Sequence, residues 1–215
     1  MNLPTKITFS RIIIIILMII GLFILNMLAH PSVGFVSPYI GNTGINVIYL
    51  FVFVIFVIAS FTDFLDGYLA RKNNQVTALG KFLDPVADKL LINSMIIFLI
   101  APSIFSPYIQ GSQLSISAWC AIIFVARDIV VDALRFIAAQ RNIVIAANIF
   151  GKLKTVFQMV AISLVLLNGW PFSYFDQSWP AGLHITDFIV YIATFVSLMS
   201  GIIYVIQNRK VFSSK

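Results

Sequence analysis

Charged residues and cysteine are both scarce in this chain. Only 10% of its 215 residues are charged, whereas soluble domains carry about 25%. A water-soluble fold of this size needs more polar surface than this composition supplies. The single cysteine, Cys120, also excludes an intramolecular disulfide. These shortages indicate a membrane protein that is not held together by disulfides.

Long apolar segments account for most of what is present, since 60% of the residues are hydrophobic. A helix crosses a bilayer with roughly 20 such residues, and six segments qualify when short ones are allowed to extend. They are approximately Ile7–Leu28, Asn46–Thr62, Leu90–Ala101, Ser117–Ala139, Ile149–Leu167 and Thr186–Ile206. We expect the second and third helices to continue into the polar segment between them. The sequence predicts an all-α polytopic membrane protein with six transmembrane helices, forming one domain over residues 1–215.

The basic residues predict the orientation of these helices. With six spans, all fourteen Lys and Arg fall on one side of the membrane, and the opposite loops, roughly 29–45, 102–116 and 168–185, contain none. Because loops rich in Lys and Arg stay in the cytoplasm, we expect both termini and a polar site on the cytoplasmic side. Nucleic-acid binding is not expected, since the basic residues belong to short loops rather than to a basic domain.

The acidic residues are all aspartates, and half of them are clustered. Asp63, Asp66, Asp84 and Asp88 lie within 26 residues at the ends of two apolar segments. Spacings of three and four residues place each pair on one helix face. Solvated helix caps are the alternative, but like charges at such spacings destabilise an exposed helix. Bound cations would relieve the repulsion, and hard divalent cations prefer oxygen ligands.

Small residues and a cation accompany the aspartates. Gly67 and Ala70 lie near the face of the first pair, and Gly80 precedes the second pair. Small residues allow a ligand or another helix to approach the backbone closely, and each is also an ordinary packing residue. Arg71 follows directly and is able to bind a phosphate through two hydrogen bonds; its alternative role is that of a cytoplasmic anchor.

Together these residues read Asp63-x-x-Asp66-Gly67-x-x-Ala70-Arg71, then eight residues, then Gly80-x-x-x-Asp84-x-x-x-Asp88. This pattern resembles the defining motif of the CDP-alcohol phosphotransferase family at all eight positions. The resemblance implies a six-helix membrane enzyme, typically a homodimer, in which an alcohol displaces CMP from a CDP-linked donor.

The resemblance also implies roles for these residues. Two Mg²⁺ or Mn²⁺ ions would be held by Asp63, Asp66, Asp84 and Asp88, and Asp88 is the candidate general base. Residues expected to contact the donor, CDP-diacylglycerol, are Gly67, Ala70, Arg71, Thr77 and Gly80. Thr8 and Arg11, near the start of the chain, either contact substrate or anchor the first helix.

Other segments resemble a bacterial branch of the family whose acceptor is glycerol 3-phosphate. They are residues 1–11, 84–91 (DPVADKLL), 127–135 and 151–159. Asp128 and Ala133 depart from that branch, which usually has Glu and Gly there. This resemblance implies a plasma-membrane enzyme of phospholipid biosynthesis whose product is phosphatidylglycerophosphate.

A phosphorylated acceptor brings about two negative charges, so cations should stand near the acidic site. The candidates are Arg127, Arg135, Lys152 and Lys154. The alternative is a structural ion-pair network of Asp128, Asp132 and Arg135. Serine, inositol phosphate and phosphatidylglycerol stay open as acceptors, because the motif handles the donor. A cation transporter is a remote alternative, since the acids lie on one side rather than across the membrane.

Overall fold

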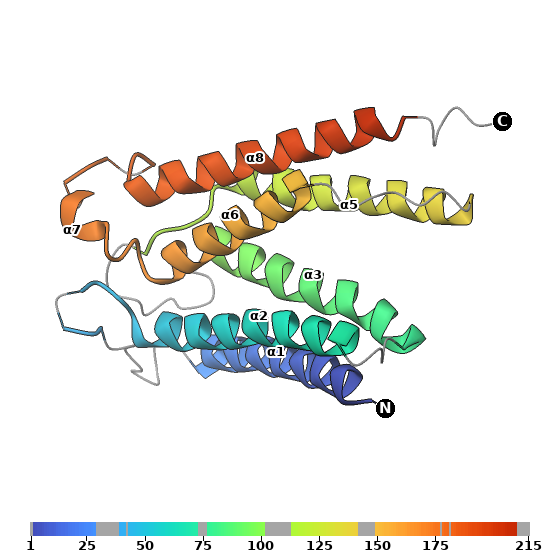
Figure 1. Ribbon diagram of the computed structural model, residues 1–215. Helices are drawn as coiled ribbons and strands as arrows, with labels where there is room; N and C mark the ends of the chain where they lie inside the picture. The colour runs from blue at the N-terminus through green and yellow to red at the C-terminus, as the bar shows by residue number, and fades with distance from the viewer. Residues whose placement is uncertain are drawn as a thin grey trace. The chain divides into compact units, whose positions relative to one another are not determined.

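The structure is a computed structural model of the whole chain. It describes residues 2–28, 39–41, 43–72, 77–101, 113–141, 149–176, 178–180 and 182–209. Within these ranges the regular elements are helices, drawn in chain order in Figure 1. They are α1 (Leu3–Leu28), α2 (Val47–Lys72), α3 (Ala78–Ile100), α5 (Ala118–Gln140), α6 (Ile149–Leu166), α7 (Ser173–Asp176) and α8 (Ile185–Gln207).

Six long helices overlap the six predicted spans, and the all-α prediction is confirmed. The expected extension is confirmed as well, because α2 continues nine residues past Asp63 to Lys72 and α3 begins twelve residues before Leu90. By length and composition, membrane-spanning segments are found at Thr5–Ile24, Ile149–Leu166 and Ile185–Gln207, with a shorter apolar stretch in α2. The number of six spans stays a prediction.

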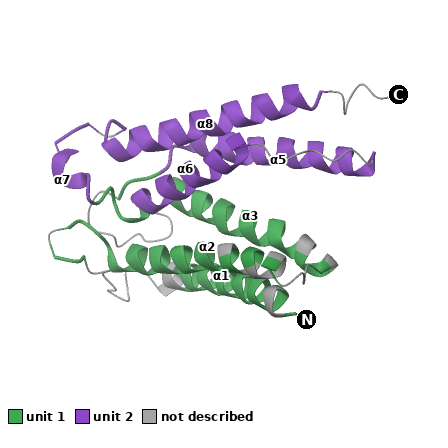
Figure 2. Ribbon diagram, in the orientation of Figure 1, with its two compact units in different colours: residues 1–115, 166–170 green, residues 116–165, 171–215 purple. Residues whose placement is uncertain are grey.

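The chain divides into two compact units, which are described separately (Figure 2). Unit 1 comprises residues 1–115 and 166–170, and unit 2 comprises residues 116–165 and 171–215. The interpretation of residues 1–215 as one domain stays a prediction.

Unit 1 is built on α1, which packs against both α2 and α3. Its core contains Ile15 and Met18 from α1, Tyr49 and Phe56 from α2, and Met95 from α3. The Tyr49 and Phe98 rings lie 5.2 Å apart between centroids. The N-terminal ends of α1 and α3 and the C-terminal end of α2 lie at the same end of this unit (Figure 1).

The outward faces of the helices are apolar rather than charged. Leu17 on α1, Phe51 on α2 and Phe195 on α8 are 60%, 65% and 63% exposed. A soluble protein rarely presents such continuous apolar surface, whereas lipid chains are as apolar as these side chains. These exposed apolar side chains are therefore suited to contact lipid, while the buried side chains are mostly apolar with a smaller number of polar ones.

Unit 2 packs α5 against α8. Val131, Leu134 and Tyr204 form a buried cluster between these two helices. Cys120 is buried in α5 as a free thiol, as expected of a small apolar residue in this span.

Two aspartates satisfy the first backbone donors of α8. The His184 N–H donates to Asp187 Oδ2 at 3.0 Å, and the Ile185 N–H donates to Asp176 Oδ2 at 2.8 Å. Asp176, in the short helix α7, is 3% exposed. The negative charges also lie at the positive end of the helix dipole, so Asp176 before α8 and Asp187 in its first turn together fix where the helix begins.

Replacing Asp176 with Ala should therefore lower the stability of unit 2. The Ile185 N–H would lose its acceptor, a change that typically costs about 1 kcal/mol at a helix N-terminus. Asp176→Asn keeps one acceptor oxygen and should cost less. The check is the thermal unfolding midpoint of both variants in detergent, and equal midpoints for Asp176→Ala and the unaltered protein would contradict this assignment.

Candidate active site

The aspartate motif lies at one end of unit 1, where α2 ends and α3 begins. Asp63 and Asp66 occur in the C-terminal part of α2, and Asp84 and Asp88 in the N-terminal part of α3. Both pairs are in α-helix, so the spacings of three and four residues place each pair on one helix face, as predicted. The side chains of Asp63, Asp84 and Asp88 are half-buried.

The first helix supplies polar partners to this motif. Arg11, which is 1% exposed, forms an ion pair with Asp63. Thr8, also 1% exposed, donates a hydrogen bond from Oγ1 to Asp84 Oδ1 at 3.0 Å. One end of α1 therefore contacts an aspartate from each half of the motif. The sequence left open whether these two residues touch substrate or anchor the first helix.

Thr77 and Gly80 have local structural roles at the start of α3. Thr77 is the N-cap of the helix, and its Oγ1 accepts a hydrogen bond from the Gly80 N–H at 3.0 Å. The Thr5 and Thr77 hydroxyl oxygens are 2.9 Å apart. A Cβ on Gly80 would lie 3.1 Å from Thr77 Oγ1, so the glycine leaves room for this cap. Their predicted contact with the donor stays a prediction.

Other predicted donor residues are described only in part. Gly67 lies in α2 and is half-buried, while the side chains of Asp66, Ala70 and Arg71 lie outside the described part of the structure. Among the side chains that are described, no group of three or more His, Cys, Asp or Glu could hold one metal ion. Asp66, the fourth predicted ligand, is not among them.

The chemistry of the donor set nevertheless fits a hard divalent cation. The motif offers carboxylate oxygens, which Mg²⁺ and Mn²⁺ prefer. Asp63 is 39% exposed on its side chain, so it is accessible despite its pairing with Arg11. A carboxylate has two oxygens and can accept an orienting hydrogen bond while binding a metal. The assignment of Asp63, Asp66, Asp84 and Asp88 to such an ion stays a prediction.

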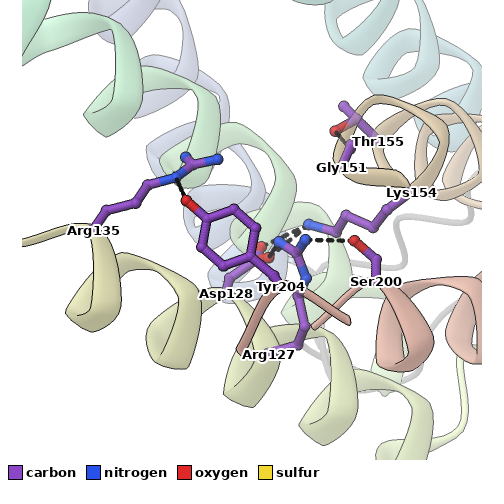
Figure 3. Close-up of polar contacts among 8 residues, drawn as sticks. All are labelled: Arg127, Asp128, Arg135, Gly151, Lys154, Thr155, Ser200 and Tyr204. Carbon is purple, nitrogen blue, oxygen red and sulfur yellow. Dashed lines mark hydrogen bonds and ion pairs between the residues drawn. The ribbon is translucent and has the colours of Figure 1, made fainter. Parts of the chain in front are cut away.

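A second polar group lies in unit 2 and centres on Asp128 (Figure 3). Lys154 Nζ donates to both Asp128 oxygens, at 2.7 and 2.8 Å, and this contact is buried. Arg127 donates from Nη1 to Asp128 Oδ1 at 3.1 Å and from Nη2 to Ser200 Oγ at 2.7 Å. Two cations thus share one carboxylate, which leaves a net positive charge in the group.

The other two predicted acceptor residues differ in surroundings. Arg135 is exposed, and its Nε donates to the Tyr204 hydroxyl at 3.0 Å, with the guanidinium carbon 5.4 Å from the ring centroid. Figure 3 shows the Arg135 guanidinium directed toward that hydroxyl. Lys152 is exposed at the start of α6. From the sequence, a structural ion-pair network of Asp128, Asp132 and Arg135 was the alternative. The ion pairs observed at Asp128 are with Arg127 and Lys154.

The contribution of α8 to this group was not predicted from the sequence. Ser200 holds Arg127, and Tyr204 holds Arg135. A Cβ on Gly201 would lie 2.7 Å from Arg127 Cγ, so only glycine lets this arginine pass across α8. The sequence pattern that could have indicated this contribution is a stripe of small and polar residues at helical spacing in an apolar span. Its members are Ala193, Thr194, Ser197, Ser200 and Gly201.

This fold, with its aspartate motif at the junction of two helices, defines a class of membrane transferase. The chain belongs to the CDP-alcohol phosphatidyltransferase family, which it matches over residues 1–206. It is therefore an enzyme and an integral membrane protein. Enzymes of this family generally depend on a divalent metal ion.

Relatives within the family carry a more specific name. A protein of Bacillus subtilis, named CDP-diacylglycerol–glycerol-3-phosphate 3-phosphatidyltransferase, is 38% identical over 96% of this chain and 95% of its own length. Proteins with the same name from Rickettsia felis and Mycoplasma genitalium are 32% and 36% identical. They cover 98% and 89% of this chain, and 97% and 77% of their own lengths.

Removing the Asp128 charge should destabilise the protein strongly. In Asp128→Asn the buried Lys154 ammonium would lose its counter-ion, and breaking a buried pair in this way costs about 3–5 kcal/mol. Asp132→Asn makes the same change one turn further along α5, at a half-buried position, and should cost less. Thermal unfolding in detergent tests this, and an unfolding midpoint of Asp128→Asn equal to that of the unaltered protein would show that the pair is not stabilising.

Proposed function

We propose that this chain transfers the phosphatidyl group of CDP-diacylglycerol to glycerol 3-phosphate, which yields phosphatidylglycerophosphate and CMP. The observation that carries the proposal is the polar end of unit 1, where the aspartate motif of α2 and α3 is contacted by α1. The full-length similarity to three relatives that share this activity in their names supports the choice of substrates.

The reaction is a displacement at phosphorus. The acceptor hydroxyl oxygen forms a bond to the phosphorus that carries diacylglycerol, and the bond from that phosphorus to the CMP oxygen breaks. The hydroxyl proton passes to a carboxylate, for which Asp88 is the proposed general base. It lies four residues after Asp84, on the same face of α3. Positioning of donor and acceptor supplies much of the remaining catalysis.

We assign Asp63, Asp66, Asp84 and Asp88 to two Mg²⁺ or Mn²⁺ ions. When bound, such ions would neutralise the negative charge of the diphosphate and the charge that develops on the leaving CMP. Gly67, Ala70, Arg71, Thr77 and Gly80 are proposed to line the donor. Arg71 contributes a fixed positive charge of the kind that binds phosphate through two hydrogen bonds.

The Asp128 group of unit 2 supports an acceptor that carries its own phosphate. Arg127, Arg135, Lys152 and Lys154 are the proposed phosphate-binding residues, and Asp128 and Asp132 are the acids among them. Four cations and two anions leave a charge of 4 − 2 = +2. Asp128 therefore orients two of the cations without cancelling the set, and a charged acceptor would still be attracted.

The proposal also covers the orientation of the chain in the membrane and its oligomeric state. In the proposed six-span arrangement all fourteen Lys and Arg fall on one side, which supports a cytoplasmic position for the termini and the active site. Glycerol 3-phosphate is water-soluble and CDP-diacylglycerol is a lipid, so a polar site at the cytoplasmic surface of a bacterial plasma membrane is accessible to both. A homodimer is proposed by analogy with the family.

An acceptor panel tests the substrate assignment. The purified full chain, with CDP-diacylglycerol and Mg²⁺, should release CMP with glycerol 3-phosphate. Serine, inositol phosphate and phosphatidylglycerol should each give much less. Excess EDTA should abolish release and added Mg²⁺ or Mn²⁺ should restore it, because the diphosphate charge would otherwise stay unneutralised. Activity in excess EDTA would refute the metal assignment, and preference for another acceptor would refute the substrate assignment.

Replacing Asp88 with Asn tests the general base. The amide cannot accept the proton, and general-base catalysis typically contributes about 10²–10⁴-fold, so kcat should fall within that range. Much of the donor affinity should remain. Asp63→Asn is the comparison, since it should weaken metal binding and turnover together. Near-normal turnover in Asp88→Asn would exclude Asp88 as the base.

A further inference from the structure

The buried stripe of α1 changes character along the helix. Residues 5, 8, 11, 15, 18 and 22 are all buried, at spacings of three and four residues, so they form one continuous face. The first three are Thr5, Thr8 and Arg11, and the later three are apolar. If this face of α1 served only to pack against other helices, apolar residues along its whole length would suffice. The polar part coincides with the end of unit 1 that carries the aspartate motif.

Each polar residue of this stripe contacts a different part of the motif region. Arg11 pairs with Asp63 in α2, Thr8 donates to Asp84 in α3, and Thr5 lies 2.9 Å from the Thr77 N-cap. Ser10, by contrast, is exposed on the same helix and donates only to the Ile7 carbonyl, at 2.8 Å. The hydroxyl of Thr8 is therefore directed at a carboxylate, while a nearby hydroxyl of similar chemistry is not.

We propose that Thr8 and Arg11 are positioning residues that orient the metal-binding carboxylates of Asp84 and Asp63. This inference rests on the proposed metal assignment. Each residue donates to one oxygen of its aspartate, which limits rotation of the carboxylate and directs it toward a bound ion. Groups that hydrogen-bond to metal ligands in this way are typically worth about 10–100-fold in metal affinity. The first helix is then part of the active site, although it contributes no metal ligand.

Direct Mn²⁺ binding by the substrate-free full chain in nanodiscs, followed by electron paramagnetic resonance, provides the test. Thr8→Val keeps the size and branching of the side chain but removes the donor, so Mn²⁺ affinity should fall about 10–100-fold. Thr8→Ser restores a hydroxyl and should recover most of the affinity. Ser10→Ala removes a hydroxyl from the exposed face of α1 and should bind Mn²⁺ as the unaltered protein does.

Arg11→Lys provides the second measurement. It keeps the charge, so the electrostatic competition with the metal is unchanged, but it loses the planar arrangement of donors. Mn²⁺ affinity should therefore fall here too, by up to tenfold. If Thr8→Val does not fold, Thr8→Ala takes its place, with the same expectation and the same Thr8→Ser comparison.

Measuring CMP release in parallel distinguishes a failure of the positioning inference from a failure of the proposed substrate assignment. Wild-type Mn²⁺ affinity in both Thr8→Val and Arg11→Lys would overturn the inference and leave α1 as a structural anchor, even if the protein uses glycerol 3-phosphate. If the unaltered chain binds Mn²⁺ but prefers another acceptor, the proposed substrate is wrong. The positioning role would be supported even in that case if Thr8→Val and Arg11→Lys lost Mn²⁺ affinity and Thr8→Ser recovered it.

Discussion

A charge can be buried among apolar helices only when a partner of opposite charge accompanies it. Both units of this enzyme depend on that constraint. In unit 1 the guanidinium of Arg11 is almost fully buried beside Asp63. In unit 2 the carboxylate of Asp128 is shared by Lys154 and Arg127. These pairs fix which helices pack together, because lipid-like side chains alone distinguish poorly between partners.

In the proposed mechanism the same pairs also hold the reacting groups in place. Groups held in place before substrate arrives need little reorganisation during the reaction. The aspartate motif occurs on helices rather than on loops, which improves the precision of its placement. Thr77 caps α3 and thereby fixes where that helix begins, at Ala78, six residues before Asp84. Local backbone chemistry therefore contributes to the position of the carboxylates.

Much of this architecture could be predicted because its signals are local. Apolar runs predicted the helices, and the Asp63 and Asp84 halves of the motif predicted their own helix faces through spacing alone. The contact of Arg11 with Asp63 could not be predicted, since 52 residues separate the partners and α-helical spacing says nothing about packing between helices. The same holds for Gly201, whose role depends on an arginine brought to it by another helix. Contacts of this kind depend on how the helices pack in the tertiary structure, which local sequence patterns do not encode.

The burial of Arg11 also bears on how the protein enters the membrane. During synthesis α1 emerges before α2, so its arginine initially has no aspartate to pair with. Arg11 lies eight residues into the helix, near enough to the end for its long side chain to extend to the lipid headgroups. Arrival of Asp63 allows the side chain to withdraw into the protein. The pairing of α1 with α2 therefore brings together the two charges that a buried Arg11 requires.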